Sequence, residues 1–192
     1  MKRSKLFRLT LTAVFIAVTC ALTWVIRIPT PSRGYINLGD CAVITGAFVL
    51  GPVYGAIAGG IGSALADLLG GYPQYIPATL IIKAAMAVTA AAVIKLFSKK
   101  GVRLSGAAVF AGGLAAAVLM VSGYFLYESL IYDGIAAAIP GIPGNAVQGV
   151  VGAVGAYFIS KALTRSGILK KTQTQQVKKP DDDAESGGEG AD

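Results

Sequence analysis

The 192-residue sequence contains no histidine and only two cysteines, and 14% of its residues are charged. The absence of histidine removes the commonest metal ligand and general base, and with it any Ser-His-Asp triad or HExxH site. Cys20 and Cys41 lie in or beside apolar runs and are expected to be small buried hydrophobic residues. The GxxxxGK[ST] phosphate-binding loop is also missing, so we expect no nucleotide hydrolysis and assign no catalytic residue, cofactor or metal site.

More than half of the residues in the sequence are apolar. Hydrophobic residues account for 54% of the chain, 25 residues are glycine, and the mean hydropathy is +0.64. Soluble domains contain about 25% charged residues, so this composition predicts a membrane protein. The net charge of +7 comes from short basic clusters beside apolar segments. Because no aromatic residues alternate with the basic ones, we expect no nucleic-acid partner.

Four apolar runs are long enough to cross a bilayer, which takes about 20 residues. A fifth stretch, between Asp40 and Asp67, has 26 consecutive uncharged residues and could form one long tilted span or two short ones. The four clear runs are Leu9 to Ile26, Pro77 to Phe97, Leu104 to Leu126 and Ile139 to Leu163.

The basic clusters favour two short helices in the fifth stretch. Short helices at Ile36 to Leu50 and Val53 to Leu69, joined at a Gly51-Pro52 hinge, give six spans and place every basic cluster on the cytoplasmic side. We therefore predict an all-α integral membrane bundle of six transmembrane helices with both termini cytoplasmic. The clusters are Lys2, Arg3, Lys5 and Arg8; Lys95, Lys99, Lys100 and Arg103; and Lys161, Arg165, Lys170, Lys171, Lys178 and Lys179.

These spans divide the chain into a basic cytoplasmic N-terminus (1–8), a six-helix membrane domain (9–165) and a tail (166–192). The tail has too little apolar surface to order, so we expect it to be disordered and cytoplasmic. The N-terminal segment also imitates a secretory signal, which would be cleaved. Retention is favoured, because cleavage would leave five spans.

Small residues recur at helical spacing in three spans. In lipid, helices associate mainly through such residues, which let two backbones approach closely. We expect the stripes of the third and sixth spans to be internal packing faces, whereas the alanine stripe of the first span is equally an internal face or a surface for a partner helix. The stripes are Ala13, Ala17 and Ala21; Gly51, Gly55, Gly59 and Ser63; and Gly141, Gly144, Gly149, Gly152 and Gly155.

Polar residues at membrane depth gather in the half of the spans predicted to face outside. Such residues pair with one another or line a cavity. A pair of Lys83 with Asp67 or Asp40 is the purely structural interpretation, but several elements supplying polar groups at one level favour a ligand pocket. The candidate binding residues are Asn37, Asp40, Asp67, Lys83, Tyr124, Glu128, Asn145 and Gln148.

The charges of this outer half limit the ligand. Four acidic residues oppose three basic ones, so the region is close to neutral. Phosphates and polycarboxylates normally bind arginine clusters or helix N-termini, and we expect instead a small neutral or weakly basic ring compound. The residues counted are Asp40, Asp67, Glu128 and Asp133 against Arg27, Arg33 and Lys83.

Three segments resemble one family of membrane proteins: Tyr35–Asp40 (YINLGD), Gly51–Lys83 (GPVYGAIAGGIGSALADLLGGYPQYIPATLIIK) and Pro143–Gln148 (PGNAVQ). They are similar to the substrate-binding S components of energy-coupling factor (ECF) vitamin transporters, in the riboflavin-type branch that includes predicted hydroxymethylpyrimidine and pyridoxine carriers. The resemblance implies a six-helix protein of the cell membrane that captures a small vitamin-like ligand from outside. It also implies partners: a transmembrane coupling subunit and two cytoplasmic ATPase subunits.

The resemblance further implies roles for particular residues. In this family an AxxxA stripe on the first helix docks the coupling subunit, which implies that role for Ala13, Ala17 and Ala21. Ligand capture uses the loop after the first helix together with helices four, five and six. In this sequence those elements contain Asn37, Asp40, Lys83, Tyr124, Glu128, Asn145 and Gln148.

The residues alone leave two other classes of protein open. A stand-alone carrier or channel would transport a small solute without ATPase partners, although carriers usually contain inverted repeats and none is evident here. A membrane enzyme would use Asp40, Asp67 and Lys83 as an acid–base cluster, but no nucleophile–base arrangement accompanies them.

Overall fold

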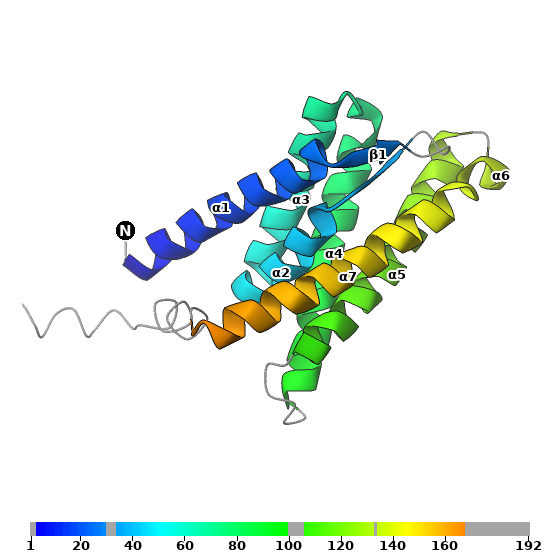
Figure 1. Cartoon of the computed structure of the whole chain (residues 1–192). Coiled ribbons are helices and arrows are strands. Elements are labelled where there is room, and N and C mark those ends of the chain that lie inside the picture. The colour runs from blue at the N-terminus through cyan, green and yellow to red at the C-terminus, as the bar shows by residue number, and fades with distance from the viewer. Residues whose placement is uncertain (1–2, 30–33, 100–105, 133, 168–192) are drawn as a thin grey trace, which may run out of the picture.

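The fold is described from a computed structural model, which covers residues 3–29, 34–99, 106–132 and 134–167. Six helices of 12 to 26 residues dominate these segments, with a short antiparallel hairpin and two single-turn helices (Figure 1). The six helices are α1 (Arg3–Val25), α2 (Gly39–Leu50), α3 (Pro52–Gly70), α4 (Ile76–Lys99), α5 (Gly106–Ile131) and α7 (Gly141–Arg165). The remaining elements are β1 (Arg27–Pro29), β2 (Tyr35–Asn37), η1 (Pro73–Tyr75) and α6 (Ile135–Ala138).

The predicted six-helix bundle is confirmed, and the bounds of its helices differ most clearly at the second helix. The predicted start of the fifth span, Leu104, lies outside the described residues. Five of the described helical segments are long and apolar enough to cross a membrane. The second span was expected to begin at Ile36, but α2 begins at Gly39. The reason is that residues 35–37 pair with residues 27–29 as strands β2 and β1, so their backbone is extended rather than helical.

Helix α2 lies at the centre of the bundle and contacts α1, α3, α4, α5 and α7. Its 12 residues rise only about 18 Å, which is less than the roughly 30 Å of a hydrocarbon core. Within α2, only Phe48 and Val49 are not fully buried. A helix this short is tolerated because its polar ends are surrounded by protein rather than lipid.

The turn between α2 and α3 is made by Gly51 and Pro52, as predicted. Gly51 has a φ of +80°, in the left-handed region that glycine adopts without strain. Pro52 is the first residue of α3, where the missing N–H has no partner to lose. The Gly51 N–H donates to the Ala47 carbonyl at 3.1 Å, so this turn also closes the end of α2.

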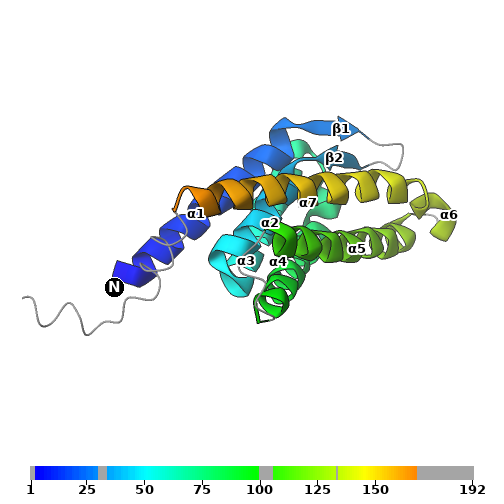
Figure 2. The same ribbon diagram turned by 60° about the horizontal axis from the view of Figure 1, so that its bottom comes forward.

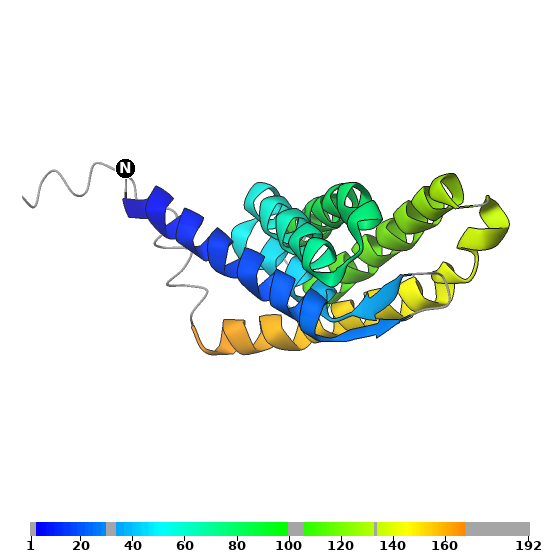
Figure 3. The ribbon, with the colours of Figure 1, turned by 90° about the horizontal axis from the view of Figure 1, so that it is seen from above.

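The helix ends sort onto two sides of the bundle. One side carries the start of α1, the α2–α3 turn and the ends of α4 and α7, and the other carries the hairpin, η1 and α6 (Figure 1). The hairpin runs alongside α7, which it contacts through β2 (Figures 2 and 3). Most of the described basic residues lie at these helix ends: Lys5 and Arg8 at the start of α1, Lys95 near the end of α4, and Lys161 and Arg165 at the end of α7. Arg27 in β1 and Lys83 in the first half of α4 are the exceptions.

The small-residue stripe of the third span is an internal packing face. A Cβ atom added at Gly55 would lie 2.8 Å from the Cα of Ala47 in α2. Gly62 is next to the stripe rather than part of it, and a Cβ added there would lie 2.7 Å from the carbonyl oxygen of Ile16 in α1. Both positions therefore need glycine, because the neighbouring backbones leave no space for a side chain.

In the stripe of the last span, Gly152 and Gly155 pack in the same way against α2, whereas Gly149 packs against α5. The contact with α2 gives a testable prediction. A Cβ added at Gly152 would lie 2.6 Å from the Cβ of Asp40 and against its backbone. Gly152→Ala must therefore push α7 away from α2, and we expect a loss of about 1–3 kcal/mol of stability, measured by thermal unfolding in detergent. Val154→Ala, on the exposed face of the same helix, should change stability little. Equal stability of the two variants would contradict this packing.

Candidate ligand-binding pocket

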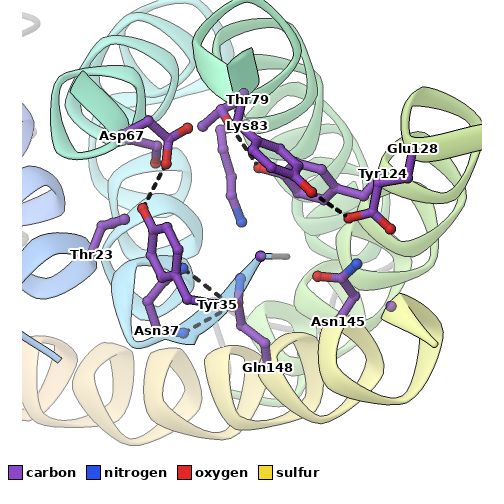
Figure 4. Close-up of a pocket in the computed structure, with 14 residues that line it drawn as sticks. Thr23, Tyr35, Asn37, Asp67, Thr79, Lys83, Tyr124, Glu128, Asn145 and Gln148 are labelled. Atoms are coloured by element: carbon purple, nitrogen blue, oxygen red, sulfur yellow. Dashed lines mark hydrogen bonds between the residues drawn. The ribbon is translucent and has the colours of Figure 1, made fainter. Parts of the chain in front are cut away.

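A polar pocket opens at the side of the bundle that carries the hairpin (Figure 4). Its walls come from β2 and from helices α3, α4, α5 and α7, with the end of α1 and η1 completing the rim. The lining residues are therefore far apart in the sequence, from Thr23 to Gln148, and the fold brings them together. The lining residues are Thr23, Gly34, Tyr35, Asn37, Ser63, Asp67, Tyr75, Thr79, Lys83, Tyr124, Glu128, Gly141, Asn145 and Gln148.

The floor of the pocket is a buried ion pair extended by amides. Lys83 Nζ, on α4, pairs with Asp40 Oδ1 on α2, and both side chains are almost completely buried. Gln148 Nε2, on α7, donates to Asp40 Oδ2 at 3.0 Å. Gln148 Oε1 in turn accepts from the backbone N–H and the side-chain amide of Asn37, at 2.9 and 3.2 Å. The sequence left open whether Lys83 pairs with Asp67 or Asp40, and the structure shows Asp40.

One wall joins the hairpin to the end of α3. The Tyr35 hydroxyl donates to Asp67 Oδ1 at 2.6 Å. Burial, together with the neighbouring carboxylate, raises the pKa of Tyr35 well above its usual value, so the phenol keeps its proton and remains a donor. Arg27 donates to the Gly70 carbonyl at 3.1 Å, where a cation also interacts favourably with the C-terminus of α3.

The opposite wall is built from tyrosines around a second carboxylate. The Tyr75 hydroxyl donates to Glu128 Oε1 at 3.1 Å and accepts from the Tyr132 hydroxyl at 3.3 Å. Thr79 and Tyr124 share a hydrogen bond of 3.0 Å between their hydroxyls. The rings of Tyr75 and Tyr124 lie 6.3 Å apart between centroids, so this wall offers aromatic surface as well as hydroxyls.

Four buried polar atoms on the pocket have no hydrogen-bond partner in the described part of the chain. They are Thr23 Oγ1, Ser63 Oγ, Asp67 Oδ2 and Glu128 Oε2. A buried unpaired polar group costs about 1–3 kcal/mol, so such groups are rare and each needs an explanation. Hydrogen bonds to a polar ligand are one way to pair such atoms, and Asn145 also extends toward the cavity from α7 (Figure 4).

Seven of the eight candidate residues surround this one pocket, although their part in binding stays a prediction. Asp40 does not line the cavity but lies beneath it, where it orients Lys83 and Gln148. The seven residues that line it are Asn37, Asp67, Lys83, Tyr124, Glu128, Asn145 and Gln148.

The sequence analysis missed several other lining side chains. Hydroxyl residues in helices usually bond to a carbonyl of their own helix, so a serine or threonine in an apolar run gives no sign that it faces a pocket. All of the missed residues except Thr23 lie in the segments that carry the family resemblance, which is the signal that could have found them. The missed side chains are Thr23, Tyr35, Ser63, Tyr75 and Thr79.

The alanine stripe of α1 lies on the outer surface of the bundle. Ala13, Ala17 and Ala21 are all exposed, whereas Thr12 and Thr19 on the opposite face of the helix are buried. Of the two interpretations that the sequence left open, the outward-facing surface is the one consistent with this placement.

Comparison with known proteins shows the family to which the chain belongs. Residues 4–165 match the family described as "ECF-type riboflavin transporter, S component". The chain belongs to the S-component family of ECF transporters. It is therefore a multi-pass membrane transport protein rather than an enzyme. S components bind a vitamin ligand and work with the transmembrane and ATPase modules of an ECF transporter.

Two relatives and one solved structure are similar to this S component. An uncharacterized protein of Pyrococcus woesei is 37% identical over 133 residues, covering 69% of this chain and 84% of its own. The "Thiamine precursor transporter HmpT" of Lactococcus lactis subsp. cremoris is 33% identical over 171 residues, covering 88% and 95%. A solved S component of a bacterial ECF transporter superposes with a TM-score of 0.63 at 20% identity, covering 83% and 96%, and shows the same fold.

Proposed function

We propose that this S component captures a one-ring vitamin precursor of the hydroxymethylpyrimidine kind in the pocket described above. The observation that carries the proposal is the set of four unpartnered polar atoms on one cavity. The thiamine-precursor relative supports the same choice.

The pocket opens to the outside in this proposal. Basic residues concentrate on cytoplasmic ends of membrane helices, and the described ones other than Arg27 and Lys83 lie in the end segments of α1, α4 and α7 that are away from the hairpin. We therefore infer that both termini are cytoplasmic and that the pocket faces the outside of the cell membrane, where the ligand is first met.

The alanine stripe is the proposed docking surface for the transmembrane coupling subunit, which is joined by two ATPase subunits. Ala13, Ala17 and Ala21 are exposed on one face of α1, and a row of small residues lets a partner helix approach the backbone closely. The described residues contain no phosphate-binding loop, so the energy for import comes from the partners.

An uptake experiment tests the function as a whole. Cells without a pyrimidine uptake system of their own would express the chain with or without the energising module, and receive labelled hydroxymethylpyrimidine. We expect uptake only when both are present. Equal uptake by the chain alone would identify a stand-alone carrier instead.

A matched pair of substitutions tests the pocket. Thr23 and Thr45 both have a buried hydroxyl oxygen without a partner among the described residues, but only Thr23 lines the cavity. Thr23→Val should raise the dissociation constant for hydroxymethylpyrimidine about tenfold, the value of one hydrogen bond. Thr45→Val should leave it unchanged, as measured by titration calorimetry. Equal effects of the two substitutions would exclude Thr23 as a ligand contact.

A further inference from the structure

We infer that this pocket selects a ligand that is uncharged or cationic and presents hydrogen-bond donors to Asp67 and Glu128, and that it rejects the phosphate ester of the same ligand. The inference rests on the proposed function and adds the charge of the ligand to it. Three features of the pocket support it. Asp67 and Glu128 each have one carboxylate oxygen without a hydrogen-bond partner among the described residues, Lys83 is already paired with Asp40, and the two carboxylates lie on different walls.

Each carboxylate has one oxygen in use and one free. Asp67 accepts from Tyr35 through Oδ1, and Glu128 accepts from Tyr75 through Oε1. The second oxygens, Oδ2 and Oε2, are buried without a partner among the described residues. A carboxylate oxygen accepts and does not donate when it is ionised, so a ligand that satisfies these atoms must bring N–H or O–H groups.

The charge of the pocket's cation is already compensated by a buried carboxylate. Lys83 is the basic residue among the described residues that line the cavity, and its ammonium group pairs with Asp40 beneath the floor. It also contacts the sulfur of Met120 at 3.0 Å and lies 5.6 Å from the centroid of the Tyr124 ring. A phosphate could draw Lys83 away only by leaving Asp40 buried and unpaired, which is strongly unfavourable.

The two free carboxylate oxygens belong to opposite walls of the cavity. Asp67 comes from the end of α3 and Glu128 from α5, and Figure 4 shows them on either side of Lys83. A ligand seated between the walls therefore meets an acceptor at each edge. With Lys83 neutralised by Asp40, Asp67 and Glu128 leave the space between the two walls negative when they are ionised, and a phosphate group there would meet like charges.

An aminopyrimidine alcohol has the chemistry that this arrangement recognises. Its exocyclic amine donates two hydrogen bonds, its ring can take up a proton, and its hydroxymethyl group donates one more. Esterification of the hydroxymethyl group replaces that donor with a dianion. The pocket would then distinguish the free precursor from its phosphorylated form.

The test is a calorimetric titration of the detergent-solubilised full chain with three probes. These are 4-amino-5-hydroxymethyl-2-methylpyrimidine, its phosphate ester, and the analogue in which hydrogen replaces the amine. We expect the phosphate ester to bind at least about 100-fold more weakly than the alcohol. The analogue without the amine should bind about tenfold more weakly, because it leaves one carboxylate oxygen unpaired.

Two isosteric substitutions separate a role in selectivity from a role in folding. Asp67→Asn and Glu128→Gln keep an oxygen that accepts from the tyrosine but remove the negative charge. Each should weaken binding of the alcohol and reduce the preference for alcohol over phosphate at least about fivefold, whereas Thr45→Val should keep that preference.

The outcomes distinguish this inference from the proposed function. If the wild-type chain binds the phosphate ester as tightly as the alcohol, the charge selection is wrong while the capture function stands. An unchanged preference in both carboxylate variants would overturn the roles of Asp67 and Glu128. If the folded chain binds none of the three probes, both the inference and the proposed ligand class fail.

Discussion

Replacing Lys83 with methionine is expected to destabilise the protein by about 3–5 kcal/mol, the cost of leaving one member of a buried ion pair without its partner. Asp40 is completely buried, and Lys83 is its cationic partner. Gln148 would still donate to Asp40 Oδ2, but an amide does not neutralise a carboxylate. Thermal unfolding in detergent measures the loss.

A double substitution shows whether the unpaired charge is the cause. Asp40→Asn combined with Lys83→Met removes both charges and keeps an acceptor for Gln148, so we expect it to recover a large part of the stability lost in Lys83→Met. If the double variant is no more stable than the single one, the loss comes from packing at Lys83 and the ion pair is not what holds α2 to α4.

Replacing Ala17 with tryptophan is expected to abolish coupled uptake and leave ligand binding intact. The side chain points away from the bundle, so an indole can be added without disturbing the core. On the proposed docking surface, however, it would hold a partner helix too far from the backbone of α1 for close packing. We expect uptake to fall at least about tenfold, measured in cells that express the energising module.

The control places the same side chain on another lipid-facing helix. Val118, in the middle of α5, is 68% exposed, so Val118→Trp adds an equal bulk away from α1. It should retain both uptake and binding. If Ala17→Trp transports normally, or if Val118→Trp loses uptake to the same degree, the alanine stripe is not the specific contact with the coupling subunit.

The fold was predictable because apolar runs indicate which segments cross the membrane, and basic residues indicate which helix ends face the cytoplasm. Apolar runs located the spans, and the parity of the basic clusters showed that the stretch between Asp40 and Asp67 holds two helices. The hairpin was missed, because two three-residue strands at residues 27–29 and 35–37 are too short to show the alternation of a sheet. Pairing between them depends on tertiary structure, which also shortens α2.

The sequence predicted at which level of the membrane the polar side chains lie, but not which of them pair with one another. Polar side chains in apolar runs had to converge, and seven of eight candidates do surround one pocket. The sequence could not show which way each helix is rotated, so it left Lys83 between Asp40 and Asp67. The rotation of each helix about its axis determines the pairing. Helix α4 directs Lys83 toward Asp40 on α2, whereas Asp67 faces the hairpin and accepts a hydrogen bond from Tyr35.

The most direct test of the central claim is the thermal stability of the purified chain, without any partner subunit, against a panel of vitamins and precursors. The panel holds hydroxymethylpyrimidine, pyridoxine, thiamine, riboflavin and biotin. A ligand at a hundredfold excess over its dissociation constant adds about 2.7 kcal/mol of stability. The account predicts a clear shift with hydroxymethylpyrimidine that Thr23→Val weakens. A folded protein that no member of the panel stabilises, or that only riboflavin stabilises, would contradict it.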